Sequence, residues 1–303
     1  MARERDRSWP PAPEALPRPV VDNHTHLDSI SHVLADGDPV PTVAELVADA
    51  AAVGVTRMVQ VGCDLPAARW TDAVVREHPA LLGAVAIHPN EAPLHAGVRE
   101  IGPDGLAPAP DERHTVDLDT ALAEIATIAR GNDRVRAIGE TGMDLFRTGE
   151  RGVVVQREAF RAHVSLAKEL GLALQIHDRD AHAEVLDVLA SDGAPERTVF
   201  HCFSGDAAMA EHCARQGWFL SFAGPVTFSA NAGLREALRR TPLTQVLVET
   251  DAPYLTPHPF RGRPNAPYLV PVTLRAVAAV HDVDLVTACD TVAATSVGVY
   301  GQW

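Results

Sequence analysis

The sequence predicts an α/β protein whose single main domain is a TIM (β/α)8 barrel. Eight short apolar and β-branched runs recur along the chain, and stretches with helical periodicity separate most of them. This alternation predicts parallel strands joined by crossover helices. A chain of 303 residues suits a closed barrel of eight strands. The absence of a G-x-G-x-x-G motif after the first run argues against a dinucleotide-binding open sheet.

The apolar runs give the positions of the strands. We expect strands at Val20–Asn23, Arg57–Gly62, Leu82–Ile87, Val135–Gly139, Leu172–Ile176, Thr198–Phe200, Phe219–Phe222 and Gln245–Val248. Helical periodicity, with Pro66 opening one helix and Gly54 and Gly171 closing two others, places the helices. They are expected at Thr42–Val53, Pro66–His78, Leu118–Arg130, Val153–Leu170, Ala181–Leu189, Ala207–Gln216, Gly233–Arg240, Tyr268–Val280 and Leu285–Thr295.

Two segments fall outside this alternation. Residues 1–19 are rich in Arg and Pro and lack the apolar core of a signal peptide, so we expect a disordered leader before a barrel of residues 20–303. Asn90–Thr115 is rich in Pro and Gly and has no clear periodicity. It is expected to be a long loop insertion, which at the functional end of a scaffold is often a lid or a binding loop.

Composition limits the possible functions. The chain is 46% hydrophobic and 22% charged, as in a globular protein with a substantial core, and no apolar run is long enough for a membrane helix. Four scattered cysteines without a secretory signal favour the cytoplasm. The net charge of -14 offers no long-range attraction for nucleic acid, so such a substrate needs local arginines or bound cations. Lys168 is the only lysine, which excludes P-loop chemistry.

Ligand-type side chains follow five of the expected strands. The first strand leads into Asn23-His24-Thr25-His26, whose two imidazoles share one side of an extended chain. A histidine or a carboxylate follows strands four, five, six and eight: Glu140, His177, His201 and Asp251. The carboxyl ends of barrel strands form one rim, so these six residues are expected to converge there.

Six such ligands exceed the four of a closed structural zinc site and suit two ions, with positions left for water. The imidazole-rich set favours Zn or Mn over Mg. A lone histidine at a strand end is more often a structural residue, but six residues of this kind on one rim would crowd charge and strong ligands with nothing to bind. The sequence therefore predicts two divalent metal ions, Zn, Mn or Mg.

Longer motifs surround these ligands. They are Asp22-Asn23-His24-Thr25-His26-Leu27-Asp28, Ile138-Gly139-Glu140-Thr141-Gly142-Met143-Asp144, Ile176-His177-Asp178-Arg179-Asp180-Ala181, His201-Cys202-Phe203-Ser204-Gly205, Glu249-Thr250-Asp251-Ala252-Pro253-Tyr254-Leu255 and Phe260-Arg261-Gly262-Arg263-Pro264-Asn265. In these motifs the sequence resembles the TatD family of metal-dependent hydrolases and deoxyribonucleases, in family order from about Val20 to the C-terminus. The resemblance implies that His24, His26, Glu140 and Asp251 hold one ion. It implies that Glu140, His177 and His201 hold the other.

The resemblance also implies a reaction, the hydrolysis of DNA ends or single strands. We expect a metal-activated water to attack a phosphodiester phosphorus, with Asp251 as the general base and Glu140 bridging the ions. Arg147, Arg179 and Arg261 lie just past the rim motifs and can bind phosphate oxygens, or they can form structural ion pairs. The ligand set suits a small-molecule amidohydrolase that cleaves an amide, a lactone or a phosphoester equally well. A non-catalytic metal-binding module is the third alternative. Asn90, Asp178 and the insertion depart from the family pattern around the rim, which concerns substrate preference.

Overall fold

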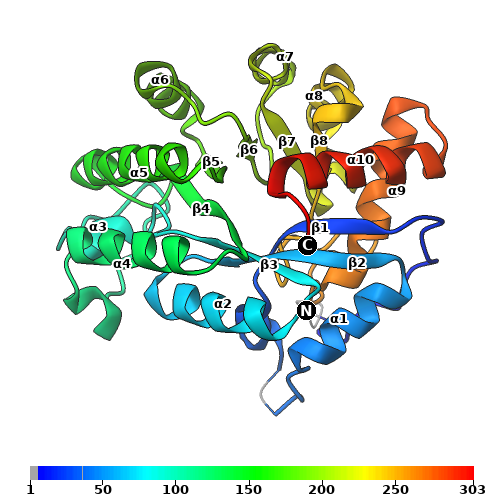
Figure 1. Cartoon of the computed structure of the whole chain (residues 1–303), viewed down its shortest axis with the longest axis horizontal. Helices are drawn as coiled ribbons and strands as arrows, with labels where there is room; N and C mark the ends of the chain where they lie inside the picture. Colours follow the sequence, from blue (N-terminus) through cyan, green and yellow to red (C-terminus); the bar gives the residue numbers. More distant parts are fainter. Residues whose placement is uncertain (1–5, 36) are drawn as a thin grey trace. The chain divides into compact units, whose positions relative to one another are not determined.

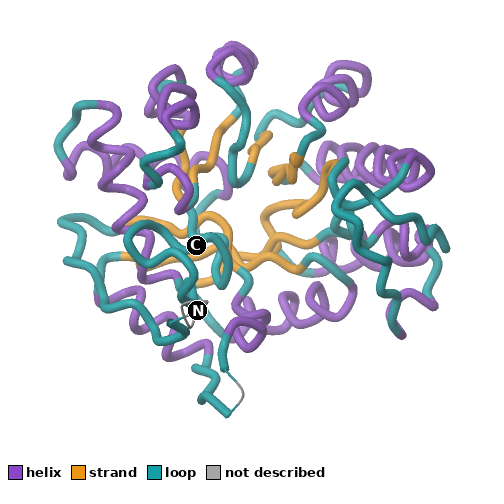
Figure 2. The backbone as a smooth tube through the Cα atoms, turned by 180° about the vertical axis from the view of Figure 1, so that it is seen from behind, coloured by secondary structure: helices purple, strands orange, loops and turns teal. Residues whose placement is uncertain are grey.

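The computed structural model describes residues 6–35 and 37–303. Eight strands form one sheet in the order in which they occur along the chain (Figure 1). They are β1 (Val20–Thr25), β2 (Val55–Gly62), β3 (Leu81–Val85), β4 (Val135–Asp144), β5 (Ala173–Arg179), β6 (Thr198–Phe200), β7 (Phe219–Phe222) and β8 (Val246–Val248). Strand, loop and helix alternate along most of the backbone (Figure 2). The eight predicted strands are therefore all found.

The helices also follow the predicted order. They are α1 (Val43–Ala52), α2 (Leu65–Glu77), α3 (Ala92–His95), α4 (Leu118–Gly131), α5 (Glu150–Leu170), α6 (His182–Asp192), α7 (Ala207–Gln216), α8 (Ala232–Arg240), α9 (Val270–His281) and α10 (Leu285–Tyr300). Short 3-10 turns are η1 (Leu27–Val33), η2 (Glu112–Thr115), η3 (Gly224–Thr227), η4 (Leu243–Gln245) and η5 (Pro267–Leu269). Among the described residues, no helix is long and apolar enough to cross a membrane.

Local sequence signals explain where several helices begin and end. Thr42 and Glu45 form a reciprocal capping box at the start of α1. Gly171 ends α5 with a φ of 60°, in the left-handed region that glycine adopts without strain. Pro271 lies in the first turn of α9, where a missing N–H costs nothing, because that turn has no hydrogen-bond acceptor for it.

The described residues pack as two compact units, and the first comprises residues 6–35, 37–60, 78–82 and 205–303. In this unit β1 pairs in parallel with β2, and β7 pairs with β8. A parallel bridge joins Thr25, at the end of β1, to Ala252, just past β8. The last strand thus lies beside the first, which is how a sheet closes into a barrel. Helix α10 packs against both of these strands.

The second unit comprises residues 61–77 and 83–204. Here β4 pairs with β5 and β5 with β6, and α5 packs on β4. Both β4 and β5 extend beyond their predicted ends. β4 continues beyond Gly139 to Asp144, and β5 continues beyond Ile176 to Arg179, because the two polar segments pair with each other from Thr141↔Ile176 to Asp144↔Arg179. Because many residues in these two extensions are polar, a search for apolar runs does not identify them as strand.

The N-terminal segment requires a correction. Residues 6–19 contain no helix or strand before β1, but the part around residues 8–16 is held against the first unit rather than disordered. The Tyr268 hydroxyl donates to the carbonyl of Pro10 at 2.6 Å, and the Leu16 amide donates to Val53 at 3.0 Å. Leu16 itself is buried. Residues 1–5 of the predicted leader lie outside the described residues.

The Asn90–Thr115 insertion is largely a loop, as predicted, but it contains two short helical turns. α3 and η2 stand near its two ends, and residues 96–111 run between them without regular structure. Polar contacts between these turns, described below, fix the two ends of that loop.

Candidate metal centre

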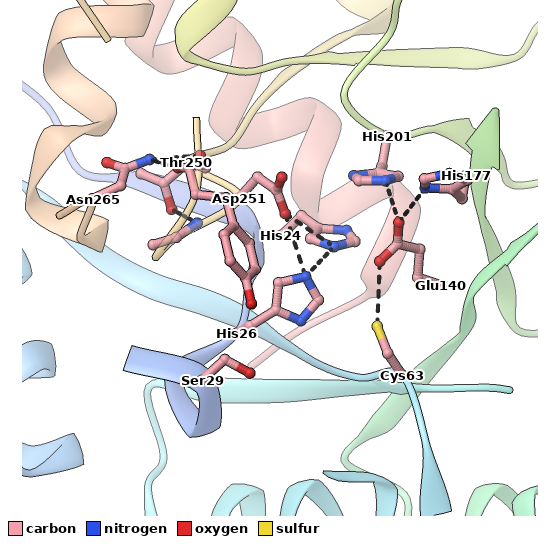
Figure 3. A network of polar contacts seen from close by, with 12 residues as sticks. His24, His26, Ser29, Cys63, Glu140, His177, His201, Thr250, Asp251 and Asn265 are labelled. Carbon is pink, nitrogen blue, oxygen red and sulfur yellow. Dashed lines mark hydrogen bonds and ion pairs between the residues drawn. The ribbon is translucent and has the colours of Figure 1, made fainter. Parts of the chain in front are cut away.

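The first ligand cluster lies in the first unit, where β1 meets the end of β8. The Nε2 atoms of His24 and His26 are 3.1 Å apart (Figure 3). The Oδ1 atom of Asp251 lies 3.3 Å from His26 Nε2 and 3.8 Å from His24 Nε2. Two backbone hydrogen bonds hold this arrangement, from the Asp251 amide to the His24 carbonyl (2.9 Å) and from the His26 amide to the Ala252 carbonyl (2.7 Å). The three predicted ligands of this unit are thus brought together.

A buried polar network supports this cluster. Asp22 is fully buried and accepts hydrogen bonds from the Thr250 amide at 2.9 Å and from the Thr250 hydroxyl. Burial raises the pKa of Asp22 to about 8, against the opposing effect of these hydrogen bonds. The side-chain amide of Asn23 donates to Val248 at 2.7 Å, and that of Asn265 donates to Thr250 at 2.8 Å. Sequence reasoning did not assign these supporting roles, although all four residues lie in the quoted motifs.

The second cluster lies in the second unit, around one oxygen of Glu140. His177 Nδ1 and His201 Nε2 are each 2.7 Å from Glu140 Oε1, so both predicted histidines are placed at this carboxylate (Figure 3). His88 Nε2 lies 3.4 Å from the same oxygen, and Cys63 Sγ lies 3.2 Å from Glu140 Oε2. His88 was expected to face the rim but was not among the predicted ligands. Its signal is the His88-Pro89 pair that follows the third strand.

The electrostatics of the second cluster follow from its burial. Burial opposes ionisation of Glu140, but the imidazoles of His201 and His88 outweigh it and hold the pKa of Glu140 well below its usual range. Burial also acts against the charged form of His177. Hydrogen bonds to Asp144 (3.2 Å) and Glu140 outweigh this effect and raise the pKa of His177 to about 9. The cluster therefore holds an ionised carboxylate beside a histidine that keeps its proton, and a divalent ion bound there would displace that proton.

A close backbone approach positions this cluster. Gly142 has a φ of 138°, and a Cβ atom there would lie 2.1 Å from the carbonyl oxygen of His177. Only glycine therefore lets β4 come this close to β5 beside the ligand. Asp144, two residues further on, receives a hydrogen bond from the Asn90 side chain at 2.9 Å and orients His177.

Comparison with known proteins decides the family. Residues 21–301 match the family model described as TatD related DNase. This chain belongs to the TatD family. It is 44% identical over 263 residues to the uncharacterized metal-dependent hydrolase TatD of Mycobacterium tuberculosis, covering 86% of this chain and 89% of that protein. It is 32% identical to the uncharacterized metal-dependent hydrolase YabD of Bacillus subtilis, over 85% of this chain and 89% of that protein. The chain is thus a TatD-family metal-dependent hydrolase.

Solved structures agree on the fold. The TatD homologue YJJV of Escherichia coli superimposes with a TM-score of 0.76 at 20% identity, covering 93% of this chain and 97% of that one. A TatD family hydrolase from Entamoeba histolytica gives 0.77 at 15% identity, covering 96% and 100%. An uncharacterized amidohydrolase from Saccharomyces cerevisiae gives 0.76 at 16% identity, covering 94% and 100%. The predicted TIM-barrel fold is confirmed.

The three arginines predicted to bind substrate have different surroundings in this TatD-family chain. Arg147 donates to Asp104 of the insertion at 2.8 Å. The exposed Arg179 guanidinium lies 4.2 Å from the centre of the Phe146 ring. The exposed Arg261 lies 5.1 Å from the Phe228 ring centre and lines a cavity of about 390 Å³ in the first unit. Arg147 therefore forms the ion pair that was the alternative to phosphate binding, whereas Arg179 and Arg261 contact aromatic rings.

The cavity that Arg261 lines is close to the first ligand cluster. Tyr254, three residues after Asp251, also lines it, and its ring centre lies 6.2 Å from that of His26. Tyr254 is 43% exposed. An accessible ring and a guanidinium therefore face the same space within the first unit.

Proposed function

We propose that this chain is a deoxyribonuclease that hydrolyses phosphodiester bonds at DNA ends or in single strands, using two divalent metal ions. The proposal is supported by the family to which the chain belongs and whose model carries the description DNase. The single structural observation that carries it is the pair of ligand clusters, one of His24, His26 and Asp251, and one of Glu140, His177 and His201.

The donor sets fit such ions. Each cluster offers imidazole nitrogens and a carboxylate, the ligands that Zn and Mn prefer. We propose that His24, His26, Glu140 and Asp251 hold one ion and that Glu140, His177 and His201 hold the other. The family resemblance assigns Glu140 to both. Ions of this kind lower the pKa of a water that they bind and offset charge on a phosphodiester.

The residues of the chain supply the remaining chemistry. The Asp251 side chain is 13% exposed, so solvent reaches a carboxylate that is already fixed by its backbone. This makes Asp251 the general base in our proposal. Asp144 orients His177 through their hydrogen bond, and Asp22 holds the backbone of His24 and Thr250 in place.

Substrate recognition is proposed for the cavity beside His26. Tyr254 can stack on a terminal base, and Arg261 can bind a phosphate oxygen in a fork geometry. No ion pair to Arg261 is found within residues 6–35 and 37–303, so its charge is available to a substrate. Local charge of this kind is needed because the protein as a whole is acidic. Arg179 is a second phosphate ligand in the proposal. For Arg147, phosphate binding stays a prediction that competes with its ion pair to Asp104.

One specific observation favours a second candidate, a hydrolase of small esters, lactones or amides. The cavity beside His26, of about 390 Å³, has the size of a small-molecule site. The same ligand clusters would serve that reaction equally well.

A cytoplasmic location stays a prediction from the sequence.

The test is a metal-dependent nuclease assay with matched variants. Purified protein is incubated with Mn, Zn or Mg and single-stranded DNA, and in parallel with a panel of esters and amides. We expect metal-stimulated cleavage of DNA, its loss with chelator, and its loss in Glu140→Ala, which controls for a contaminating nuclease. Turnover of the panel alone would favour the second candidate. Absence of turnover on every substrate would contradict both.

Two further variants test the assigned roles. Asp251→Asn should abolish turnover with the fold intact. Asp282→Asn is its control, since Asp282 has nearly the same left-handed φ (53° against 54°) at the end of α9. Arg261→Ala should raise KM for DNA at least about tenfold with little change in kcat, because it removes a charge-assisted contact. Arg239→Ala, on α8, removes an equal charge from a pair with Glu236 and should leave KM unchanged.

A further inference from the structure

A second group of metal-type ligands lies within the second unit, in the insertion and apart from Glu140. Glu91, His95 and His114 each offer one ligand atom, and these atoms lie within 4.8 Å of one another. We call these three residues the insertion cluster. His95 is the last residue of α3, and His114 lies in η2, on the far side of the 96–111 loop. His95 and His114 are 4% and 8% exposed, so the cluster is largely shielded from water.

His95 presents a nitrogen lone pair to this cluster. Its Nδ1 lies 2.8 Å from the carbonyl oxygen of Val116, and a carbonyl can only accept, so Nδ1 carries the hydrogen. Nε2 is then an acceptor, and this buried atom has no hydrogen-bond partner within residues 6–35 and 37–303. Leaving such an atom unsatisfied costs about 1–3 kcal/mol. An imidazole whose other nitrogen donates to a carbonyl is in the state that metal ligands adopt.

His114 and Glu91 complete the set. His114 Nε2 lies 2.9 Å from Glu91 Oε2, and the His95 and His114 ring centres are 5.0 Å apart. On its other side, His114 Nδ1 accepts a hydrogen bond from the Asp111 amide at 2.9 Å, so without an ion Nε2 carries the ring hydrogen and donates it to Glu91. When Nε2 binds an ion, the ring hydrogen leaves Nε2 and one is taken up at Nδ1, where the Asp111 carboxylate, 3.2 Å away, accepts it in place of the amide contact.

The surrounding charge favours a cation. The guanidinium of Arg113 pairs with Glu91 (2.7 Å), with Asp64 (3.3 Å) and with Asp111. Three carboxylates thus surround one guanidinium, and the hydrogen bonds of Arg113 lower the pKa of Glu91 although burial raises it. Negative charge therefore remains in excess around two imidazoles.

We propose that Glu91, His95 and His114 bind a divalent transition ion of the zinc class, separate from the family's catalytic centre. Two imidazoles and a carboxylate are a zinc ligand set. The ion would join α3 to η2 and so close the 96–111 loop, which makes its role structural. This proposal does not depend on the nuclease function, because its ligands belong to neither catalytic cluster.

The first test locates zinc in the wild-type protein. Crystals grown with Zn²⁺ are measured at the zinc absorption edge. We expect an anomalous peak between the three side chains, in addition to any peak at Glu140. A map with zinc at Glu140 and no peak in the insertion cluster would overturn the proposal without any variant being made.

The second test counts zinc and follows the loop. His95→Asn keeps a side-chain N–H that can donate to Val116 and removes Nε2. After dialysis, we expect wild-type protein to retain one more zinc ion per chain than His95→Asn, and His212→Asn on α7 to match the wild type. Zn²⁺ should slow chymotrypsin cleavage at Leu106, which is 58% exposed, at least about threefold in the wild type but not in His95→Asn. Equal zinc content in His95→Asn and wild type would contradict the proposal.

Discussion

A buried histidine of the second unit predicts how the stability of this protein depends on pH. His163, on α5, is 1% exposed, and its ring accepts from the Ile87 amide at 3.3 Å and contacts the Thr141 hydroxyl at 2.8 Å. These partners lie next to His88 and Glu140 in the chain. Burial lowers the pKa of His163 from 6.5 to about 4, so the folded protein holds this ring neutral.

The sign and size of the effect follow from this pKa. A depressed pKa in the folded state means that the stabilisation is complete above pH 6.5 and is lost as the pH falls towards 4. Between pH 6.5 and about pH 5, only the unfolded chain gains the proton. Each pH unit in that range costs about 1.36 kcal/mol, so the free energy of unfolding falls by about 2 kcal/mol from this residue.

The assay is urea unfolding of wild type and of His163→Gln at about pH 7.5 and about pH 5. Glutamine can still accept a hydrogen bond but does not titrate, and all other ionisable groups cancel in the comparison. We expect the stability advantage of the wild type over the variant to shrink by about 2 kcal/mol at the lower pH. An advantage that is the same at both pH values would refute a buried, neutral His163.

Two further predictions concern packing. Gly142→Ala should lower the free energy of unfolding by more than about 2 kcal/mol, because its Cβ would overlap the His177 carbonyl oxygen. Gly233→Ala, which meets nothing within 4 Å on α8, is the control and should melt at or above the wild-type temperature. Tyr268→Phe should lower the free energy of unfolding by about 1 kcal/mol, because the hydrogen bond to Pro10 is lost. Removal of residues 1–19 should lower it further, because the buried Leu16 side chain is lost as well. Equal melting temperatures for full-length and truncated protein would show that the N-terminal segment contributes nothing.

The strands and the six candidate ligands could be predicted from the sequence for the same physical reason. In a parallel barrel, each strand must be apolar and its carboxyl end must face the same rim, so a ligand after an apolar run is placed by topology alone. His24, Glu140, His177 and Asp251 were singled out in this way. The structure places His24 beside Asp251 and His177 beside Glu140, and their role as metal ligands stays a prediction. The polar ends of β4 and β5 were not found, because they pair through Gly142 and not through an apolar pattern.

The N-terminal segment and the insertion cluster escaped prediction for a different physical reason. The backbone carbonyl groups of residues 8–16 accept hydrogen bonds from Tyr268 and Arg275. Every residue type has a backbone carbonyl, so the composition of the segment does not predict these contacts. His95 and His114 are separated by a loop without periodicity. Near them, the Arg113 guanidinium forms ion pairs with three carboxylates. Arg113 therefore connects Asp64, Glu91 and Asp111, which are far apart in the sequence, and no periodic pattern predicts such contacts. For Arg147, phosphate binding stays a prediction, because Asp104 of the insertion pairs with the same guanidinium and competes with a phosphate.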